Sequence, residues 1–335
     1  MLPAPQHLEG ETALFDRCGE GTRLGFGCAG LMRTPSRRSR QRLLGEAFEQ
    51  GIRHFDVARM YGLGVAEEEL GRFARGRREQ ITIATKFGIE PSRSASRLAR
   101  LQAPARAAVA RFPALRAALK RREGAFHVAR RYDGDAARMS LKTSLEALGT
   151  DYVDVLFVHD PGATDLTDAE ELVGTLEELR RDGRLRAWGV SGEFEPSAQL
   201  RDAVDAPLVF QVRDDMFDPA PIGPEADAIT FGVLSRAVSR ILERLGASGE
   251  RRSRWSRIVG EDCGRPEVVA SLLLQDALER NAGGGVLFST TRPERVKAAV
   301  AAAERVSSGA GTAALRGFRE CMRVEFGEMG GSDRG

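Results

Sequence analysis

Four side chains that can donate, accept or stabilise a proton lie where runs of β-forming residues end. Asp56 and Tyr61 lie in HFDVARMYG, Lys86 in ATKFG and His159 in FVHDP. Each has an ordinary explanation when taken alone: a turn cap, loop filler, a solvated charge or a hydrogen bond to backbone. Because the carboxyl ends of parallel strands meet at one mouth when a sheet closes into a barrel, their joint placement favours one shared site.

The lysine carries extra information because arginine supplies nearly all of the positive charge in this chain. Only four of its 50 basic residues are lysines. A lysine ammonium is a compact charge whose pKa shifts readily. Its place at a strand end therefore favours a chemical role for Lys86 over simple solvation.

Eight short β-rich runs alternate with helical patterns. Each crossover between parallel strands needs a helix, so this alternation predicts an α/β fold with a parallel sheet, and eight units favour closure into a (β/α)8 TIM barrel. An open doubly wound sheet is the alternative. The predicted strands are 23–28, 53–57, 81–86, 153–158, 186–190, 207–211, 227–231 and 285–288; the predicted helices are 38–50, 66–75, 135–148, 168–182, 196–203, 266–281 and 293–306.

The 335 residues are expected to form a single domain over 1–335, with two connections too long for simple crossovers. One is a basic insertion at about 91–132, and the other is a second long loop at about 232–264. In a barrel, such excess belongs to the loops of the C-terminal face, where active sites are built. Residues 92–131 carry a charge of +10 and the other 295 residues sum to −8, which gives the net charge of +2.

Three roles for the basic insertion stay open. Its arginines could form a lid that attracts an anionic substrate or clamps a cofactor. Alternatively, the insertion could simply be a solvated helical segment with a basic surface. Nucleic-acid binding is the third role. It is disfavoured because aromatic residues do not interleave with the arginines and the rest of the chain is acidic.

Composition excludes several other classes of protein. Hydrophobic residues make up 42% and charged residues 29% of the chain, which is typical of a globular protein and not of a disordered chain or coiled coil. The apolar runs are far shorter than the ~20 residues of a membrane span, and the first residues do not resemble a secretory signal, so a cytoplasmic protein is expected. The four cysteines form no CxxC pair, and no metal site is expected.

A GxGxxG motif made by Gly25, Gly27 and Gly30 follows the first predicted strand. It suggests a Rossmann dinucleotide site, with Asp56 as the acidic residue. The fit is poor because the next helical pattern begins only at about Ser36. The glycines either let backbone approach a ligand at the mouth of the first strand or simply make a turn.

Together these stretches resemble the aldo-keto reductase family. The resembling segments, from about 24 to 300, are LGFGCAGL, GIRHFDVARMYGLGVAEEELG, ITIATKFG, SLKTSLEALGTDYVDVLFVHDP, LRRDGRLRAWGVSG and VLFSTTRPERV. YGLGVAEEELG and VHDP are most similar to its branch of sugar 1-dehydrogenases and pyridoxal dehydrogenases. The resemblance implies a barrel that binds NADPH without a Rossmann domain and transfers hydride between the nicotinamide and an aldehyde, a ketone or a sugar lactol.

The resemblance also carries the family's catalytic tetrad over to Asp56, Tyr61, Lys86 and His159. Hydride transfer to a carbonyl leaves an alkoxide, so the site needs a proton donor at that oxygen. Tyr61 is expected to be the general acid and base, with Lys86 lowering the pKa of its phenol and Asp56 holding the ammonium. His159 is expected to donate a hydrogen bond to the substrate oxygen.

Cofactor contacts implied by the resemblance surround these four residues. Ser191 and Gln211 match positions that hold the nicotinamide carboxamide, Phe231 matches the ring that stacks on the nicotinamide, and Gly192 replaces a usual Asn. The complete implied set is Gly27, Cys28, Ala29, Asp56, Ser191, Gly192, Gln211, Phe231, Gly232, Leu234, Ser289, Thr290, Thr291 and Arg295.

The segment STTRPERV bears on the choice of cofactor. Ser289, Thr290, Thr291 and Arg295 match the family's pocket for the adenosine 2′-phosphate, so NADP(H) is expected. Ser289 stands where many members have Lys and Ala299 where many have Asn, so NAD(H) remains possible. An ordinary capped helix is the structural alternative for this segment.

An interpretation of another class is a cofactor-binding redox sensor or regulatory subunit with little turnover, similar to the family's potassium-channel β subunits. The complete tetrad argues against it, and a multiple-turnover assay separates the two. The expected partner is a small carbonyl or sugar substrate, without nucleic acid or membrane, and the chain is expected to be a monomer or a small homo-oligomer.

Overall fold

Eight parallel strands close into a barrel in the computed structural model, which describes residues 22–91, 129–162, 164–166, 169–193, 209–222 and 228–327. The strand order around the barrel is β1-β10-β9-β8-β7-β6-β3-β2. The predicted TIM barrel is confirmed, and the open doubly wound sheet is excluded. The strands are β1 Leu24–Gly27, β2 His54–Asp56, β3 Thr82–Phe87, β6 Val153–His159, β7 Leu185–Gly192, β8 Val209–Arg213, β9 Ala228–Phe231 and β10 Gly285–Phe288.

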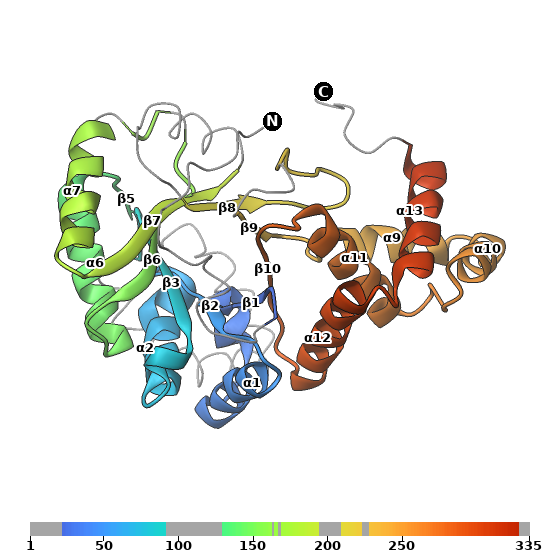
Figure 1. Ribbon diagram of the computed structural model, residues 1–335, viewed down its shortest axis with the longest axis horizontal. Helices are drawn as coiled ribbons and strands as arrows, with labels where there is room; N and C mark the ends of the chain where they lie inside the picture. The colour runs from blue at the N-terminus through green and yellow to red at the C-terminus, as the bar shows by residue number, and fades with distance from the viewer. Residues whose placement is uncertain are drawn as a thin grey trace, which may run out of the picture.

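Helices pack side by side around the outside of the barrel, where α12 contacts α1, α1 contacts α2, α2 contacts α6 and α6 contacts α7 (Figure 1). Pro266 and Pro293 lie in the first turn of their helices, where a missing N–H costs nothing. The helix expected over 196–203 lies outside the described residues. The bounds are α1 Arg37–Glu49, α2 Val65–Ala74, α6 Gly134–Leu148, α7 Ala169–Arg181, α11 Pro266–Arg280 and α12 Pro293–Ser308.

The second long connection is helical, so the expectation of a long loop at about 232–264 was wrong. It contains α9 (Ala237–Gly246) and α10 (Gly249–Val259), and the chain ends its described part with α13 (Thr312–Phe326). These three helices lie to one side of the barrel, beyond α11 (Figure 1). Trp255 of α10 is fully buried, and its ring meets Phe318 of α13 edge-on, with centroids 6.0 Å apart.

Short elements follow the carboxyl ends of the strands. Cys28–Arg33 forms a 3-10 turn, η2, and α1 begins only after Ser36, whose hydroxyl caps it by accepting a hydrogen bond from the Ser39 N–H. The GxGxxG motif therefore opens a turn and not a Rossmann helix. Further short elements after strand ends are η3 (Tyr61–Gly64) and the antiparallel pair of β4 (Ile89–Glu90) with β5 (Ala129–Arg130), whereas η4 (Arg78–Gln80) lies between α2 and the start of β3.

Two apolar layers make the core. One fills the barrel and contains Ala84 and Phe157, and the other, larger one lies between the strands and the helices. Side chains alternate between the two faces of a strand. Lys86, two residues after Ala84 on β3, therefore points into the barrel, at the end where the strands finish.

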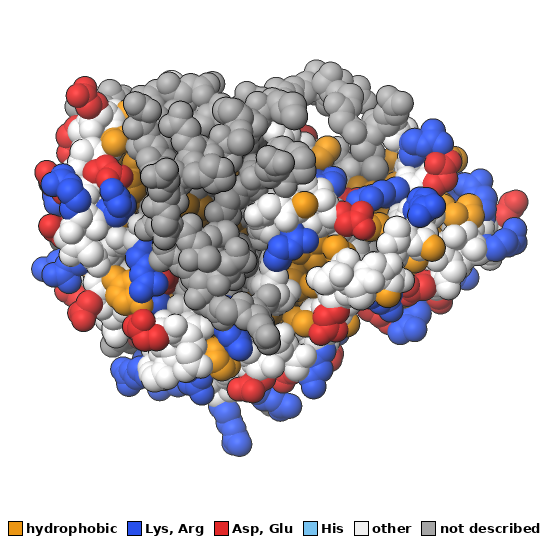
Figure 2. All heavy atoms as spheres, viewed as in Figure 1, with side chains coloured by type: hydrophobic (Ala, Val, Ile, Leu, Met, Phe, Trp, Pro, Cys, Tyr) orange, Lys and Arg blue, Asp and Glu red, His pale blue; other side chains and the backbone are white. Residues whose placement is uncertain are grey.

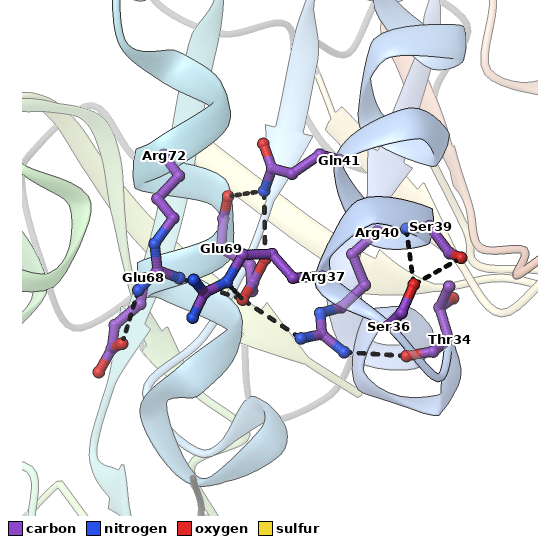
Figure 3. A network of polar contacts seen from close by, with 9 residues as sticks. All are labelled: Thr34, Ser36, Arg37, Ser39, Arg40, Gln41, Glu68, Glu69 and Arg72. Carbon is purple, nitrogen blue, oxygen red and sulfur yellow. Dashed lines mark hydrogen bonds and ion pairs between the residues drawn. The ribbon is translucent and has the colours of Figure 1, made fainter. Parts of the chain in front are cut away.

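A buried carboxylate joins the first two helices (Figure 3). Glu69 of α2, 1% exposed, accepts hydrogen bonds from Arg40 at 3.3 Å, Arg72 at 3.1 Å and Gln41 at 3.2 Å. Arg40 also donates to the carbonyl of Thr34 at 3.0 Å, just before α1. A buried charge is tolerated only when it is paired and hydrogen-bonded. This network fixes α1 against α2, and with them the loops that leave β1 and β2.

Basic and acidic side chains are interspersed over the helices on the face seen in Figure 2. Ion pairs such as that between Arg319 of α13 and Glu279 of α11, 2.8 Å, link neighbouring helices. Among the described helices, none is long and apolar enough to cross a membrane. Within the same residues, His, Cys, Asp and Glu side chains form no cluster that could hold a metal ion.

Candidate active site

The carboxyl ends of β2, β3 and β6 bring the predicted tetrad to one mouth of the barrel. Asp56 ends β2, Lys86 is the penultimate residue of β3, and His159 ends β6. Tyr61 opens η3, the turn that follows β2. Asp56, Tyr61 and His159 line the same cavity, and Lys86 lies directly beneath it in contact with Asp56 and Tyr61.

Lys86 and Asp56 form a fully buried ion pair. Their exposed fractions are 1% and 3%. The ammonium also donates to the carbonyl of Val57 at 3.2 Å. Burial lowers the pKa of Lys86, and the adjacent Asp56 carboxylate opposes this effect. Asp56 thus holds the lysine ammonium in place and favours its charged form.

A hydrogen-bonded chain extends the pair to two residues that were expected only as cofactor contacts. Gln211 donates from Nε2 to Oδ2 of Asp56 at 2.7 Å, and Ser191 donates from its hydroxyl to Oε1 of Gln211. Both residues are buried at the ends of adjacent strands. Asp56 therefore accepts from two donors, and the side-chain amide of Gln211 has a fixed orientation.

Tyr61 stands between the lysine and the histidine. The Nζ atom of Lys86 lies 5.5 Å from the centroid of the Tyr61 ring, and the rings of Tyr61 and His159 meet edge-on with centroids 6.1 Å apart. Burial, followed by the charge of Asp56, raises the pKa of the Tyr61 phenol. The expected lowering by Lys86 is not found, because burial dominates and Asp56 offsets the lysine charge.

His159 is uncharged at neutral pH. Burial lowers the pKa of its imidazole to about 3, and the positive charges of Lys86 and Arg130 act in the same direction. Its Nδ1 atom is buried without a hydrogen-bond partner among the described residues. A neutral imidazole can donate a hydrogen bond to a ligand oxygen without bringing a charge into the site.

A cavity of about 870 Å³ begins at the tetrad and extends past the ends of β9 and β10 to α11 and α12. Two expected cofactor residues do not line it: Cys28, the first residue of η2, is fully buried in the core, and Thr291 lies in an exposed bend. The expected residues that do line it are Gly27, Ala29, Asp56, Ser191, Gly192, Gln211, Phe231, Gly232, Leu234, Ser289, Thr290 and Arg295.

The end of the cavity at α12 has the features of an anion site. Arg295 lies in the first turn of α12, and no side chain caps the helix there. Thr290 accepts a hydrogen bond from the N–H of Arg292 at 3.1 Å, and Ser289 donates to the carbonyl of Gly27 at 2.6 Å. Uncapped backbone N–H groups and a guanidinium favour a phosphate, whereas the Ser289 hydroxyl is already used to join β10 to β1.

Two cations line the cavity without an ion pair to any residue that the structure describes: Arg295, which was expected from the sequence, and Arg33, which was not. Arg33 folds back over Gly30, where a Cβ atom would lie 2.8 Å from its guanidinium. The acidic residues that line the cavity are all paired with cations, in the pairs Asp56–Lys86, Asp160–Arg130, Glu193–Arg213 and Glu267–Arg265. The cavity therefore suits an anionic ligand.

The comparisons with known proteins agree on one family. The model of the Aldo/keto reductase family matches residues 23–221. D-threo-aldose 1-dehydrogenase from Pseudomonas sp is 32% identical over 196 residues, 55% of this chain and 54% of that protein. Aldo-keto reductase yakc [NADP(+)] from Schizosaccharomyces pombe is 30% identical over 216 residues, 63% and 53% of the two chains. The chain thus spans about half the length of these curated relatives.

Solved structures share the fold over nearly the whole chain. Aldo-keto reductase AKR11C1 from Bacillus halodurans, in its holo form, superposes with a TM-score of 0.66 at 18% identity and covers 97% of this chain and 99% of its own. An aldo-keto reductase from Klebsiella pneumoniae in complex with NADPH gives 0.61 at 18% identity, with 94% and 96% covered. At this identity the likeness shows the fold alone.

Proposed function

Because this chain belongs to the aldo/keto reductase family, we propose that it is an NADP(H)-dependent oxidoreductase that transfers hydride between the nicotinamide and a carbonyl or alcohol carbon. The observation that carries this proposal is the meeting of Tyr61, His159 and the buried Lys86–Asp56 pair at one end of a long cavity. Aldehydes, ketones and sugar lactols are the proposed substrates, and the similarity to D-threo-aldose 1-dehydrogenase supports a sugar.

The residues of the cavity fit a dinucleotide. Ser191 and Gln211 offer a buried hydroxyl and amide to the nicotinamide carboxamide, and Phe231 offers an aromatic face beside them. Arg295 and the open first turn of α12 would hold a phosphate, which favours NADP(H) over NAD(H), and Arg33 adds a second unpaired cation. When bound, the cofactor supplies or accepts the hydride.

Tyr61 is the proposed proton donor and acceptor. Its raised pKa keeps the phenol protonated through the neutral range, which is the form that must give a proton to the developing alkoxide during reduction. As that proton leaves, the Lys86 ammonium over the ring stabilises the phenolate. Oxidation runs in reverse: it requires the phenolate form of Tyr61, which takes the proton of the alcohol.

His159 is the proposed partner of the substrate oxygen. Its neutral imidazole lies next to the Tyr61 ring and lines the cavity, so it can donate a hydrogen bond to the same oxygen that Tyr61 protonates. Two donors that converge on one oxygen fix the angle of the carbonyl and stabilise the negative charge that develops there.

A multiple-turnover assay with a panel of aldehydes, ketones and aldoses tests this function. NADPH and NADH are compared for reduction, and NADP⁺ and NAD⁺ for oxidation. We expect many turnovers with at least one carbonyl or sugar and a lower KM for the phosphorylated cofactor. A cofactor that is bound and oxidised only once per chain would contradict an enzyme and favour a redox sensor.

A further inference from the structure

The two-stranded sheet β4–β5 lies next to the proposed active site and brings Tyr132 against the main chain of His159, at the edge of that site. Ile89 pairs with Arg130, and the N–H of Arg131 donates to the carbonyl of Gly88 at 2.9 Å, so the chain re-enters the barrel mouth alongside the end of β3. Tyr132, 7% exposed, follows at once. This sheet thus brings a tyrosine from the returning end of the long insertion to the strand ends.

The Tyr132 hydroxyl holds the main chain of the proposed catalytic histidine. It donates to the carbonyl of His159 at 2.8 Å and lies 3.3 Å from the carbonyl of Asp160. Gly88 makes this position possible: at its φ of +104°, a Cβ atom would lie 2.2 Å from Cε1 of the Tyr132 ring. The tyrosine ring occupies space that only a glycine leaves free.

The corner that the hydroxyl holds is strained. Asp160 has a φ of +49°, in the left-handed region that residues other than glycine rarely adopt. Its N–H donates to the carbonyl of Ser191 at 2.5 Å, and an ideal Cβ on Gly192 would lie 3.1 Å from the Asp160 Cα. A conformation of this kind persists only where the surroundings hold it, and the Tyr132 hydroxyl is one of the groups that contact this corner.

The same sheet also braces the loop of Tyr61. Glu90 of β4 is ion-paired with Arg59 at 3.4 Å, and Arg59 is held by the fully buried Glu67 of α2 at 2.6 Å. Arg59 lies two residues before Tyr61. The β4–β5 sheet therefore contacts both sides of the Tyr61–His159 pair, one through Arg59 and the other through Tyr132.

We propose that Tyr132 is a positioning residue for the hydride-transfer reaction, and that its hydroxyl sets the place of the His159 imidazole relative to Tyr61 by holding the His159–Asp160 main chain. This inference rests on the proposed function. Without the hydroxyl, the corner at Asp160 relaxes toward an unstrained conformation, and His159, the residue before it, shifts with it. The edge-on contact of 6.1 Å between His159 and Tyr61 is then lost.

Tyr132→Phe tests this role because it removes one oxygen atom and keeps the ring. We expect kcat/KM for a carbonyl substrate to fall about 10- to 100-fold, the loss that small misplacements of a reacting group produce, while the NADPH Kd changes less than about twofold and the thermal midpoint moves by less than about 3 °C. Tyr152→Phe is the matched control, since the Tyr152 hydroxyl bonds Glu79 in an exposed position away from the cavity. It should leave kcat/KM unchanged.

Two further readouts separate positioning from general damage. In a double-mutant cycle, Tyr132→Phe should have little further effect on kcat/KM once His159→Gln is present, whereas independent losses would multiply. In ¹⁵N-histidine NMR spectra, the His159 ring signals should shift in Tyr132→Phe and not in Tyr152→Phe. Multiplying losses, or an unmoved His159 signal, would overturn the positioning role. Absence of turnover by the wild-type chain would contradict the proposed function instead, and the NMR comparison would still decide the role of Tyr132.

Discussion

The Nζ atom of Lys86 lies 5.5 Å from the centroid of the Tyr61 ring, over a phenol that is itself partly buried. The same ammonium is ion-paired with the Asp56 carboxylate. The Tyr61 phenol is therefore close to a positive charge that a neighbouring negative charge largely neutralises. Burial then decides the outcome, and the pKa of Tyr61 is raised. In the proposed reaction, the phenol is thus prepared to donate its proton, and proton abstraction by Tyr61 would require alkaline conditions.

The first prediction concerns the pH dependence of the two directions. Oxidation needs the Tyr61 phenolate, and because its pKa lies above the ordinary value of about 10, the phenolate fraction rises about tenfold for each pH unit up to at least that pH. We expect kcat/KM for alcohol or sugar oxidation to rise without a plateau to pH ~10, while reduction stays level through neutrality. A plateau of the oxidation profile below pH ~8 would indicate a phenol whose pKa is lowered by Lys86.

The second prediction concerns the buried Lys86–Asp56 pair. Lys86→Met leaves the Asp56 carboxylate buried without its cation, so we expect the free energy of unfolding to fall by about 3–5 kcal/mol in urea titrations. Lys297→Met is the matched control, because Lys297 is 63% exposed and lies 3.5 Å from Glu46. It should cost less than about 1 kcal/mol. An equal decrease in the free energy of unfolding in the two variants would show that the buried pair stabilises the fold no more than an exposed one.

The third prediction follows from two histidines that stay neutral in the folded chain. Burial lowers the pKa of His54 to about 4 and that of His159 to about 3, against about 6.5 in the unfolded chain. Between the folded and the unfolded pKa values, each histidine binds more protons in the unfolded chain than in the folded one. The free energy of unfolding therefore falls as the pH decreases, by about 1 kcal/mol per histidine between pH 6 and 5. His54→Gln should reduce this slope measurably in urea titrations at both pH values, and an unchanged slope would contradict the assignment for His54.

The fourth prediction uses two glycines with opposite surroundings. A Cβ atom on Gly27 would lie 2.6 Å from the Ser289 hydroxyl, so Gly27→Ala should break the hydrogen bond that this hydroxyl donates to the Gly27 carbonyl. We expect the free energy of unfolding to fall by about 1–2 kcal/mol and NADPH binding to weaken. Gly45 lies inside α1 with nothing within 4 Å of a Cβ, so Gly45→Ala should raise the free energy of unfolding by about 0.5–1 kcal/mol. Calorimetry measures NADPH binding, and urea titrations measure the free energy of unfolding. If the free energy of unfolding changed with the same sign in Gly27→Ala and Gly45→Ala, the close packing of Gly27 against Ser289 would not have the predicted effect.

Strand ends were the part of the fold that the sequence predicted well. The predicted runs that end at Val57, Lys86 and Val158 alternate with helical patterns, and closure of a parallel barrel brings such ends together whatever the conformation of the loops. The three helices beyond α11 were missed. The segment 232–264 is rich in arginine, and charged residues separate its apolar residues, such as Trp255, so its sequence resembles that of a surface loop. In the structure, its helices form because α13 packs against α10 and covers these apolar residues.

Properties that depend on packing were not predictable. The sequence placed Lys86 near Tyr61, but the sign of the Tyr61 pKa shift depends on burial and on the distance to Asp56, which no local pattern reveals. Tyr132 gave no signal because it reaches His159 only after a long insertion returns to the barrel. In the sequence, nothing distinguishes Arg33 from the many arginines on the surface. Its role becomes apparent only from its position in the cavity, over Gly30.

Above all, we propose that Tyr61 moves the proton in an NADP(H)-dependent reaction. The most direct test follows NADPH consumption with the best carbonyl substrate by the wild-type chain and by Tyr61→Phe, both shown by calorimetry to bind NADPH with similar Kd. We predict many turnovers by the wild type and a loss of at least about 100-fold in kcat for the variant, the contribution expected of a general acid. A Tyr61→Phe variant that turns over at the wild-type rate would contradict the claim.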